Sequence, residues 1–124
     1  MSSTKNVLRK WDAIVAGSMA TNITSPVTNV QFLDNICIQL NFTGTPTGTF
    51  SVEVSVDHEQ DSQGAVTQAG NWVALPLEPT PVAAGSADQI ILDLNQISQP
   101  WIRVIYTATS GTGSLDMIIS AKMI

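Results

Sequence analysis

The amino-acid sequence predicts an all-β fold, an antiparallel β-sandwich of jelly-roll-like type with about eight short strands. Several segments alternate apolar and polar residues, which is the period of a half-buried strand. Turn residues separate these segments at close spacing, since the chain holds 8 Gly and 6 Pro. Charged residues make up 12% of the chain, about half of the usual ~25%. β-Branched and uncharged polar residues, which suit sheet surfaces, take their place.

Charge divides the chain unevenly. The 124 residues fit one domain. Residues 1–11 carry Lys5, Arg9 and Lys10 and no acid, a charge of +3, whereas the remainder carries −8. We therefore predict a basic N-terminal arm over residues 1–11 and a single β-sandwich domain over residues 12–124. The arm is expected either to dock on an acidic protein surface or to stay solvated.

The strongest alternation lies in the first half of the chain. Phe50, Val52, Val54 and Val56 share one face of the segment Thr49–Asp57. The preceding segment, Asn35–Phe42, also places its large apolar residues on one face. A Gly/Pro-rich link over residues 43–48 joins the two segments. We expect the pair to form a hairpin with a longer loop.

A second pair of strands is expected at the C-terminus. Trp101–Thr107 and Ser114–Ile124 alternate in the same way, and residues 108–113 between them are rich in Gly, Ser and Thr. Both segments also carry apolar residues on their second face, for example Ile105 and Ile118. Strands that are apolar on both faces lie in the middle of a sheet or under a partner.

The remaining elements are short. Asp93–Ile97 predicts a single helical turn that ends before Pro100. Two polar segments, His58–Asn71 and Pro76–Asp88, are expected to be surface loops. Four further segments are predicted as strands, namely Ala13–Met19, Thr28–Leu33, Trp72–Leu75 and Gln89–Leu92.

The sequence offers little for catalysis or for metal binding. With one Cys and one His, any thiol–imidazole pair must join Cys37 to His58. Asp57, Glu59 and Asp61 could hold Ca²⁺, although a solvated acidic loop is the favoured reading. We therefore expect no enzyme, no catalytic or metal site and no cofactor, and we leave open whether loop 57–71 binds Ca²⁺ or glycan.

Cellular location follows from a few absences. The single Cys37 cannot form an intramolecular disulfide. The N-terminal residues lack the apolar core of a signal peptide, and no apolar run approaches the ~20 residues of a membrane span. The acidic body is a poor nucleic-acid ligand, because phosphate binding needs clustered cations. We expect a chain that is made inside a cell, is not secreted, and binds neither nucleic acid nor membrane.

Binding to other proteins is the function class that remains. Trp anchors protein interfaces disproportionately, and Trp11 adjoins the basic arm. We predict Lys5, Arg9, Lys10 and Trp11 as interface residues. Alternatively, Trp72 and Trp101 could stack on sugar rings if both are exposed, as in carbohydrate-binding β-sandwiches.

Several segments resemble small proteins of tailed bacteriophages. They are Gly17–Met19, Leu40–Val52, Gly85–Ala87, Leu92–Gln96, Pro100–Thr107 and Thr109–Leu115. The likeness covers most of the chain, and Pro100–Thr107 is its most specific part. The acidic loop His58–Asn71 departs from the family pattern because it is longer than the turn found there. The resemblance therefore does not indicate which face contacts the partner.

The resemblance implies a structural protein of the virion that is made in the host cytoplasm and decorates the capsid. It carries over no catalytic residues. Other virion proteins of capsid or tail are the implied partners. A homo-oligomer is expected for such a part, and a trimer would suit a three-fold position of a capsid. The alternative is a carbohydrate- or host-surface-binding module of a phage tail or fibre.

Overall fold

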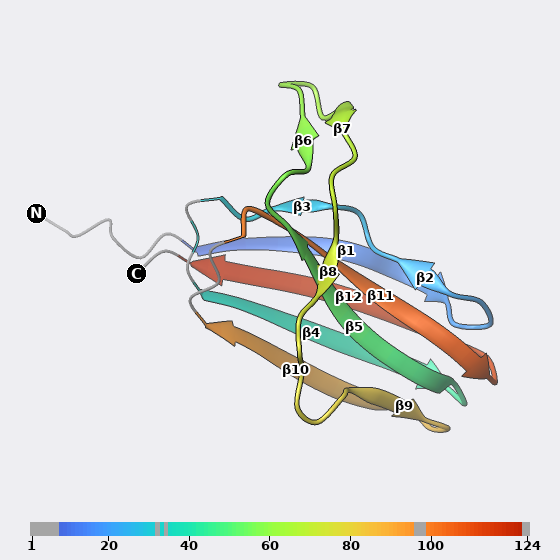
Figure 1. Ribbon diagram of the computed structural model, residues 1–124. Helices are drawn as coiled ribbons and strands as arrows, with labels where there is room; N and C mark the ends of the chain where they lie inside the picture. The colour runs from blue at the N-terminus through green and yellow to red at the C-terminus, as the bar shows by residue number, and fades with distance from the viewer. Residues whose placement is uncertain (1–7, 32, 34, 96–98, 123–124) are drawn as a thin grey trace, which may run out of the picture.

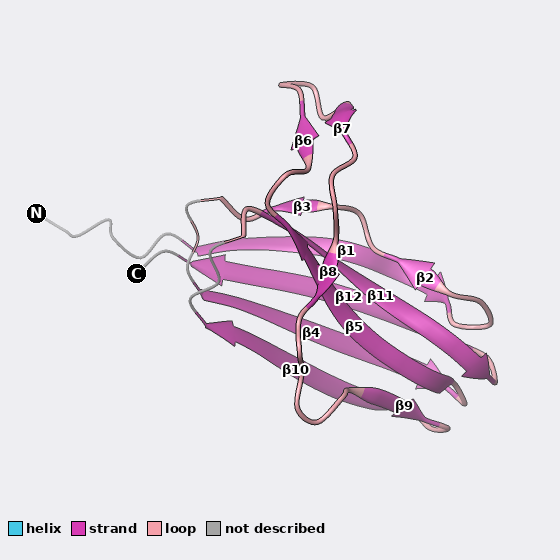
Figure 2. Cartoon of the chain, viewed as in Figure 1, coloured by secondary structure: helices cyan, strands magenta, loops and turns pink. Residues whose placement is uncertain are grey.

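The computed structural model describes residues 8–31, 33, 35–95 and 99–122, and all regular structure within them is strand (Figure 2). No helix that could cross a membrane occurs among these residues. The strands are β1 (Leu8–Ser18), β2 (Ile23–Thr24), β3 (Thr28–Asn29), β4 (Asn35–Gly44), β5 (Thr47–Ser55), β6 (Glu59–Gln60), β7 (Val66–Gln68), β8 (Val73–Ala74), β9 (Val82–Ala84), β10 (Asp88–Asn95), β11 (Trp101–Ser110) and β12 (Gly113–Lys122).

Two antiparallel sheets lie face to face (Figure 1). The four-stranded sheet has the order β1-β12-β4-β10, and the six-stranded sheet has the order β2-β11-β5-β8, with β3 beside β11 and β9 beside β5. The predicted all-β, antiparallel sandwich is therefore confirmed. The twelve strands of the described residues exceed the expected eight because the connections contain four further strands of only two or three residues: β2, β6, β7 and β9.

The core follows from the alternation along the long strands. Along the central parts of β4, β5, β11 and β12, every second residue points between the sheets and is buried. Ile38, Leu40, Val52, Ile102 and Ile119 are each 0% exposed. Burying an aliphatic side chain of this size contributes about 1.5–3 kcal/mol. The prediction that the two C-terminal strands occupy central positions is also confirmed, since β11 and β12 each have neighbours on both sides.

The predicted hairpin is wrong in its pairing, and the second pair of strands does not form a hairpin either. β4 lies in the four-stranded sheet and β5 in the six-stranded sheet, and the same holds for β12 and β11. Each link therefore crosses from one sheet to the other, and the strands that it joins face each other across the core. The links lie together, because the Thr45 N–H donates to the Thr112 carbonyl at 2.8 Å. Alternation shows which face of a strand is buried, but it does not identify the partner strand. A strand in the opposite sheet and a neighbour in the same sheet both bury the face that points to the core.

Three smaller expectations are corrected. The helical turn over residues 93–97 is wrong where it can be compared, because β10 continues through Asn95, paired with Asn35; residues 96–98 lie outside the described residues. Residues 8–11 of the predicted basic arm pair with β12 as part of β1, and residues 1–7 lie outside the described residues. The loop over residues 58–71 contains its own hairpin, β6 and β7, which projects away from the sandwich (Figure 1).

One core side chain is imperfectly satisfied. The hydroxyl of Tyr106 is buried without a hydrogen-bond partner among the described residues, and burial raises the pKa of this phenol. An unpaired buried hydroxyl costs free energy, because it has lost its water without replacement. The ring itself packs on Phe50, with the ring centroids 4.9 Å apart.

Tyr106→Phe is therefore expected to stabilise the protein by about 1 kcal/mol, since it removes the hydroxyl and keeps the ring. Thermal unfolding followed by circular dichroism would show a midpoint higher by roughly 4 °C. A lower midpoint would mean that the hydroxyl has a partner that stabilises the fold.

Candidate partner-binding groove

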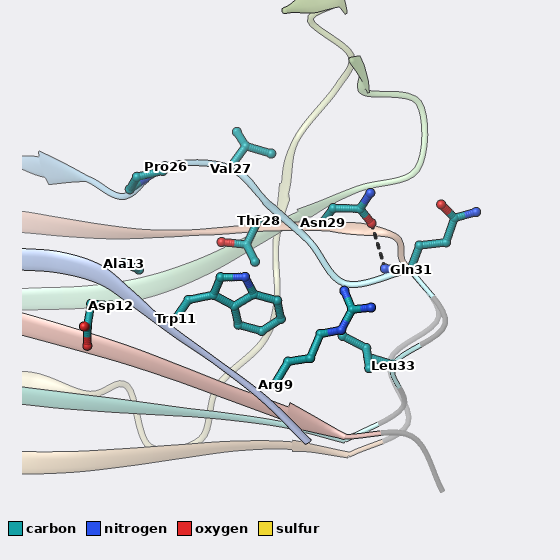
Figure 3. A pocket seen from close by; sticks show the side chains of 10 residues that line it. All are labelled: Arg9, Trp11, Asp12, Ala13, Pro26, Val27, Thr28, Asn29, Gln31 and Leu33. Carbon is teal, nitrogen blue, oxygen red and sulfur yellow. Dashed lines mark hydrogen bonds between the residues drawn. The ribbon is translucent and has the colours of Figure 1, made fainter. Parts of the chain in front are cut away.

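A groove opens at one edge of the sandwich, between β1 of the four-stranded sheet and residues 26–33. Its volume is about 610 Å³. Figure 3 shows the Trp11 ring lying between β1 and Thr28, and the Arg9 side chain reaching toward Leu33 and Gln31. Trp11 is half-buried and packs against the core, so one part of the indole is anchored and another part faces the groove. The groove thus combines an anchored aromatic surface with an exposed cation.

The floor and walls of the groove mix apolar and polar groups. Val27 and Leu33 add apolar surface, and Asn29 and Gln31 line the polar side. The Asn29 Oδ1 accepts a hydrogen bond from the Gln31 N–H at 2.9 Å, which fixes the turn after β3. Protein-binding surfaces typically combine aromatic residues and Arg in an apolar centre with a polar rim. This groove has that composition.

The structure brings together two of the four predicted interface residues. Arg9 and Trp11 alternate with Lys10 along β1, so Lys10 is exposed on the opposite face of the strand and does not line the groove. Lys5 lies outside the described residues. The partners of Trp11 in the groove, Val27 and Leu33, gave no signal in the sequence beyond an expected strand over Thr28–Leu33.

The Trp72 and Trp101 rings do not form an open platform for a sugar. The guanidinium carbon of Arg103 lies 4.3 Å from the centroid of the Trp72 ring, which is cation–π distance. The His58 ring lies 5.3 Å from Trp72 and 4.9 Å from Trp101. Both indoles are half-buried in this cluster, which joins the base of the β6–β7 hairpin to the six-stranded sheet.

His58 is held in one tautomer. Its Nδ1 lies 2.9 Å from the Ala69 carbonyl, which can only accept, so Nδ1 carries the proton. Its Nε2 then accepts from the Gln60 amide at 3.0 Å. Both ring nitrogens are therefore engaged, and the ring is buried. These contacts describe a structural histidine.

The only possible thiol–imidazole pair is not assembled. Cys37 lies on the outer face of the four-stranded sheet, beside Ser120 and Asp93, whereas His58 packs on Trp101 of the six-stranded sheet. Burial, and then the charge of Asp93, raise the pKa of the Cys37 thiol, and a protonated thiol is a weak nucleophile.

Two acidic residues of the 57–71 segment, Asp57 and Asp61, accept hydrogen bonds from the backbone. Asp61 Oδ1 accepts the Gln63 and Ala65 N–H groups, each at 2.9 Å, and closes the tip of the hairpin. Asp57 accepts from Asn71 at the base of the hairpin. In the described ranges, no three His, Cys, Asp or Glu residues are placed to share a metal ion.

The Asp57 carboxylate fixes the two ends of this segment to each other. Its Oδ1 accepts the Asn71 N–H at 2.7 Å, its Oδ2 accepts the Asn71 amide at 2.8 Å, and Ser55 Oγ donates at 3.0 Å. The Asn71 backbone bond is the main cause that lowers the pKa of Asp57 below its ordinary 3.8. A lowered folded pKa means that the carboxylate stabilises the fold above the unfolded pKa and loses that effect as pH falls through the folded pKa.

Acid unfolding should therefore depend on Asp57. Wild-type protein is expected to lose more stability between about pH 5 and about pH 2 than Asp57→Asn, which has no carboxylate to protonate. Urea unfolding monitored by Trp fluorescence measures the difference. Glu59→Gln, a change in the same segment, is the matched control and should keep the wild-type pH dependence. Identical pH profiles for wild type and Asp57→Asn would contradict the assignment.

Comparison with known proteins places the fold. No protein-family model matches the sequence, and no curated protein matches it. A chain in the structure of infectious bursal disease virus, Gt strain, is similar over 98% of this chain, with a TM-score of 0.57 and 11% identity. A chain of dimeric latent PorU from Porphyromonas gingivalis covers 95% of it, with a TM-score of 0.45 and 10% identity.

The protein spans about a third of the virus chain, 33% of its length, and 12% of the PorU chain. At such low identity, the similarity to the virus chain concerns the fold. This protein thus shares its all-β sandwich with part of a chain of a virus structure.

Proposed function

We propose that this chain is a structural protein of a tailed-bacteriophage virion, that it decorates the capsid, and that it acts by packing against other proteins rather than by catalysis. The groove between β1 and residues 26–33 carries the proposal, because it places Trp11 and Arg9 where a neighbouring protein can contact them. Trp and Arg are the residues most enriched among those that dominate interface affinity.

Two further observations support a virion part. The fold is similar to part of a chain of infectious bursal disease virus, and segments such as Pro100–Thr107 resemble small proteins of tailed phages. A virion component occurs in many copies, so a modest contact for each copy gives stable attachment through multivalency. The engaged nitrogens of His58 and the protonated Cys37 thiol fit a protein without catalysis.

The proposal predicts that the protein is found on particles. Phage particles from a host that expresses the tagged chain would be banded by density-gradient centrifugation, and each fraction would be probed for the tag. The chain is expected in the particle band and should resist a moderate salt wash. A chain that stays in the soluble fractions, with none in the particle band, would overturn the proposal.

Groove variants sharpen this experiment. Arg9→Glu changes an exposed groove side chain, and Trp11→Ala removes the aromatic surface. Both are expected to reduce particle-bound protein about tenfold, a loss of about 1.4 kcal/mol of binding energy. Val66→Ala, at an exposed site on the projecting hairpin, is the control and should bind as wild type. Circular dichroism would confirm that each variant is folded.

A further inference from the structure

The four-stranded sheet has two open edges. Among the described residues, β1 pairs on one side with β12, and β10 pairs on one side with β4. All neighbours in this sheet are antiparallel. The strand directions therefore alternate across the sheet, and β1 and β10 run in opposite directions. A second copy placed beside the first, in the same orientation, sets its β1 antiparallel to β10.

The two edges differ in charge. β1 carries two exposed cations near its start, Arg9 and Lys10, and one exposed carboxylate, Asp12, whereas β10 carries only carboxylates, the exposed Asp88 and Asp93. Charges on edge strands usually prevent uncontrolled pairing. Here a cationic edge and an anionic edge belong to the same sheet, so they attract each other only between copies.

The register within the sheet aligns these charges. Lys10 pairs with Ser120, Ser120 with Cys37, and Cys37 with Asp93, so the four residues form one row across the outer face. Continuing the row into a second copy places its Lys10 directly opposite Asp93. Directly opposed unlike charges stabilise an antiparallel pair, and like charges destabilise it.

The same register explains an exposed apolar residue. Ile91 is 56% exposed on the outer face of β10, two residues from Asp93. In this register it lies opposite Asp12 of the second copy and is the diagonal neighbour of the incoming Lys10, whose methylene stem can cover it. On the inner face, Trp11 of the second copy follows the row of Ile119, Ile38 and Leu92.

Irregularities limit the pairing to the basic end of β1. The register of β1 shifts between Asp12 and Ile14 and again between Ile14 and Gly17. Ala16 has a φ of 52°, and Asp116 Oδ1 accepts its N–H at 2.8 Å. Bulges of this kind stop a further strand from pairing. The regular part, residues 8–12, is the part that faces Asp93 in the row described above.

We propose that the chain self-assembles head to tail, with residues 8–12 of one copy extending the sheet beside residues 91–95 of the next. This inference rests on the proposed function and names the neighbour at the β1 edge as a second copy. Contacts of this kind repeat from copy to copy and close into a ring where the rotation permits. A two-fold contact between two β10 edges would instead bring together only acidic edges.

Light scattering after size-exclusion chromatography tests the proposal with opposite charge reversals. Wild type is expected as an oligomer. Lys10→Asp sets two carboxylates opposite each other in the row and Asp93→Lys sets two ammonium groups there, so each variant alone should associate at least about tenfold more weakly. An equimolar mixture of the two restores Lys–Asp contacts between unlike copies and should recover association that neither variant shows alone.

Lys122→Glu is the matched control. It reverses a charge on β12, an interior strand of the same sheet, and should leave the mass unchanged. An oligomer that persists in both single variants would overturn the head-to-tail contact while leaving the virion role intact. A wild-type monomer at high micromolar concentration would remove the self-assembly altogether, and particle binding would then be judged by the gradient experiment.

Discussion

Replacing Gly111 with alanine is expected to lower the free energy of unfolding by about 3 kcal/mol or more. Gly111 lies in the link between β11 and β12 with a φ of 83°, a conformation that costs any residue with a Cβ. An added Cβ would also collide with the Thr45 carbonyl of the neighbouring link. That collision would push apart the two links between the sheets. The hydrogen bond from the Thr45 N–H to the Thr112 carbonyl otherwise holds these links together.

Gly64→Ala isolates the conformational part of this loss. Gly64 has a similar φ of 85°, but nothing lies within 4 Å of an added Cβ. Its substitution should cost only about 1 kcal/mol. Urea unfolding of both variants measures the difference, which reports the steric clash. Equal losses in the two variants would show that the two links do not press on each other.

Ser25→Ala is the second change with a large expected effect, about 2 kcal/mol of destabilisation. Ser25 lies between the short strands β2 and β3, both of which pair with β11. Its Oγ accepts the buried Val104 N–H at 2.8 Å and donates to the Pro26 carbonyl at 3.1 Å. Its own N–H donates to the Val104 carbonyl at 2.9 Å. Alanine would leave the Val104 N–H without its partner.

Thr24→Ala is the control for this variant. Thr24 is the exposed neighbour of Ser25 in β2, and a surface change of this kind is usually worth within about 0.5 kcal/mol. Chemical denaturation of both variants compares them directly. A Ser25→Ala loss no larger than that of Thr24→Ala would mean that water replaces the Oγ at Val104.

The sequence predicted the sandwich because the alternation of apolar and polar residues in a half-buried strand can be recognised without knowing its neighbours. Phe50, Val52 and Val54 alternate with polar residues whatever lies beside them, and all three are buried as expected. Val56, predicted on the same face, lies beyond the end of β5 and is 73% exposed. Pairing is different, because it depends on which strands meet after the chain turns. The link over residues 45–46 suits a hairpin as well as a crossing between sheets, so only the fold as a whole decides between them.

The groove could be predicted only in part. Trp11 and Arg9 stood out through their residue types, and both line the groove. The residues opposite, such as Val27 and Leu33, are ordinary apolar residues of a connection, and their place beside β1 depends on how β3 pairs with β11. The sequence also did not predict the hydrogen bonds between Asp57 and Asn71, because the two residues lie 14 positions apart.

Amide hydrogen exchange on free and particle-bound protein tests the central claim most directly, because it shows which backbone groups a partner covers. Peptides from residues 9–12 of β1 and from the groove segment 26–31 are expected to exchange more slowly in the particle-bound protein. Peptides from the projecting β6–β7 hairpin should exchange at the same rate in both states. Protection of the hairpin, with unchanged exchange along β1, would contradict the account.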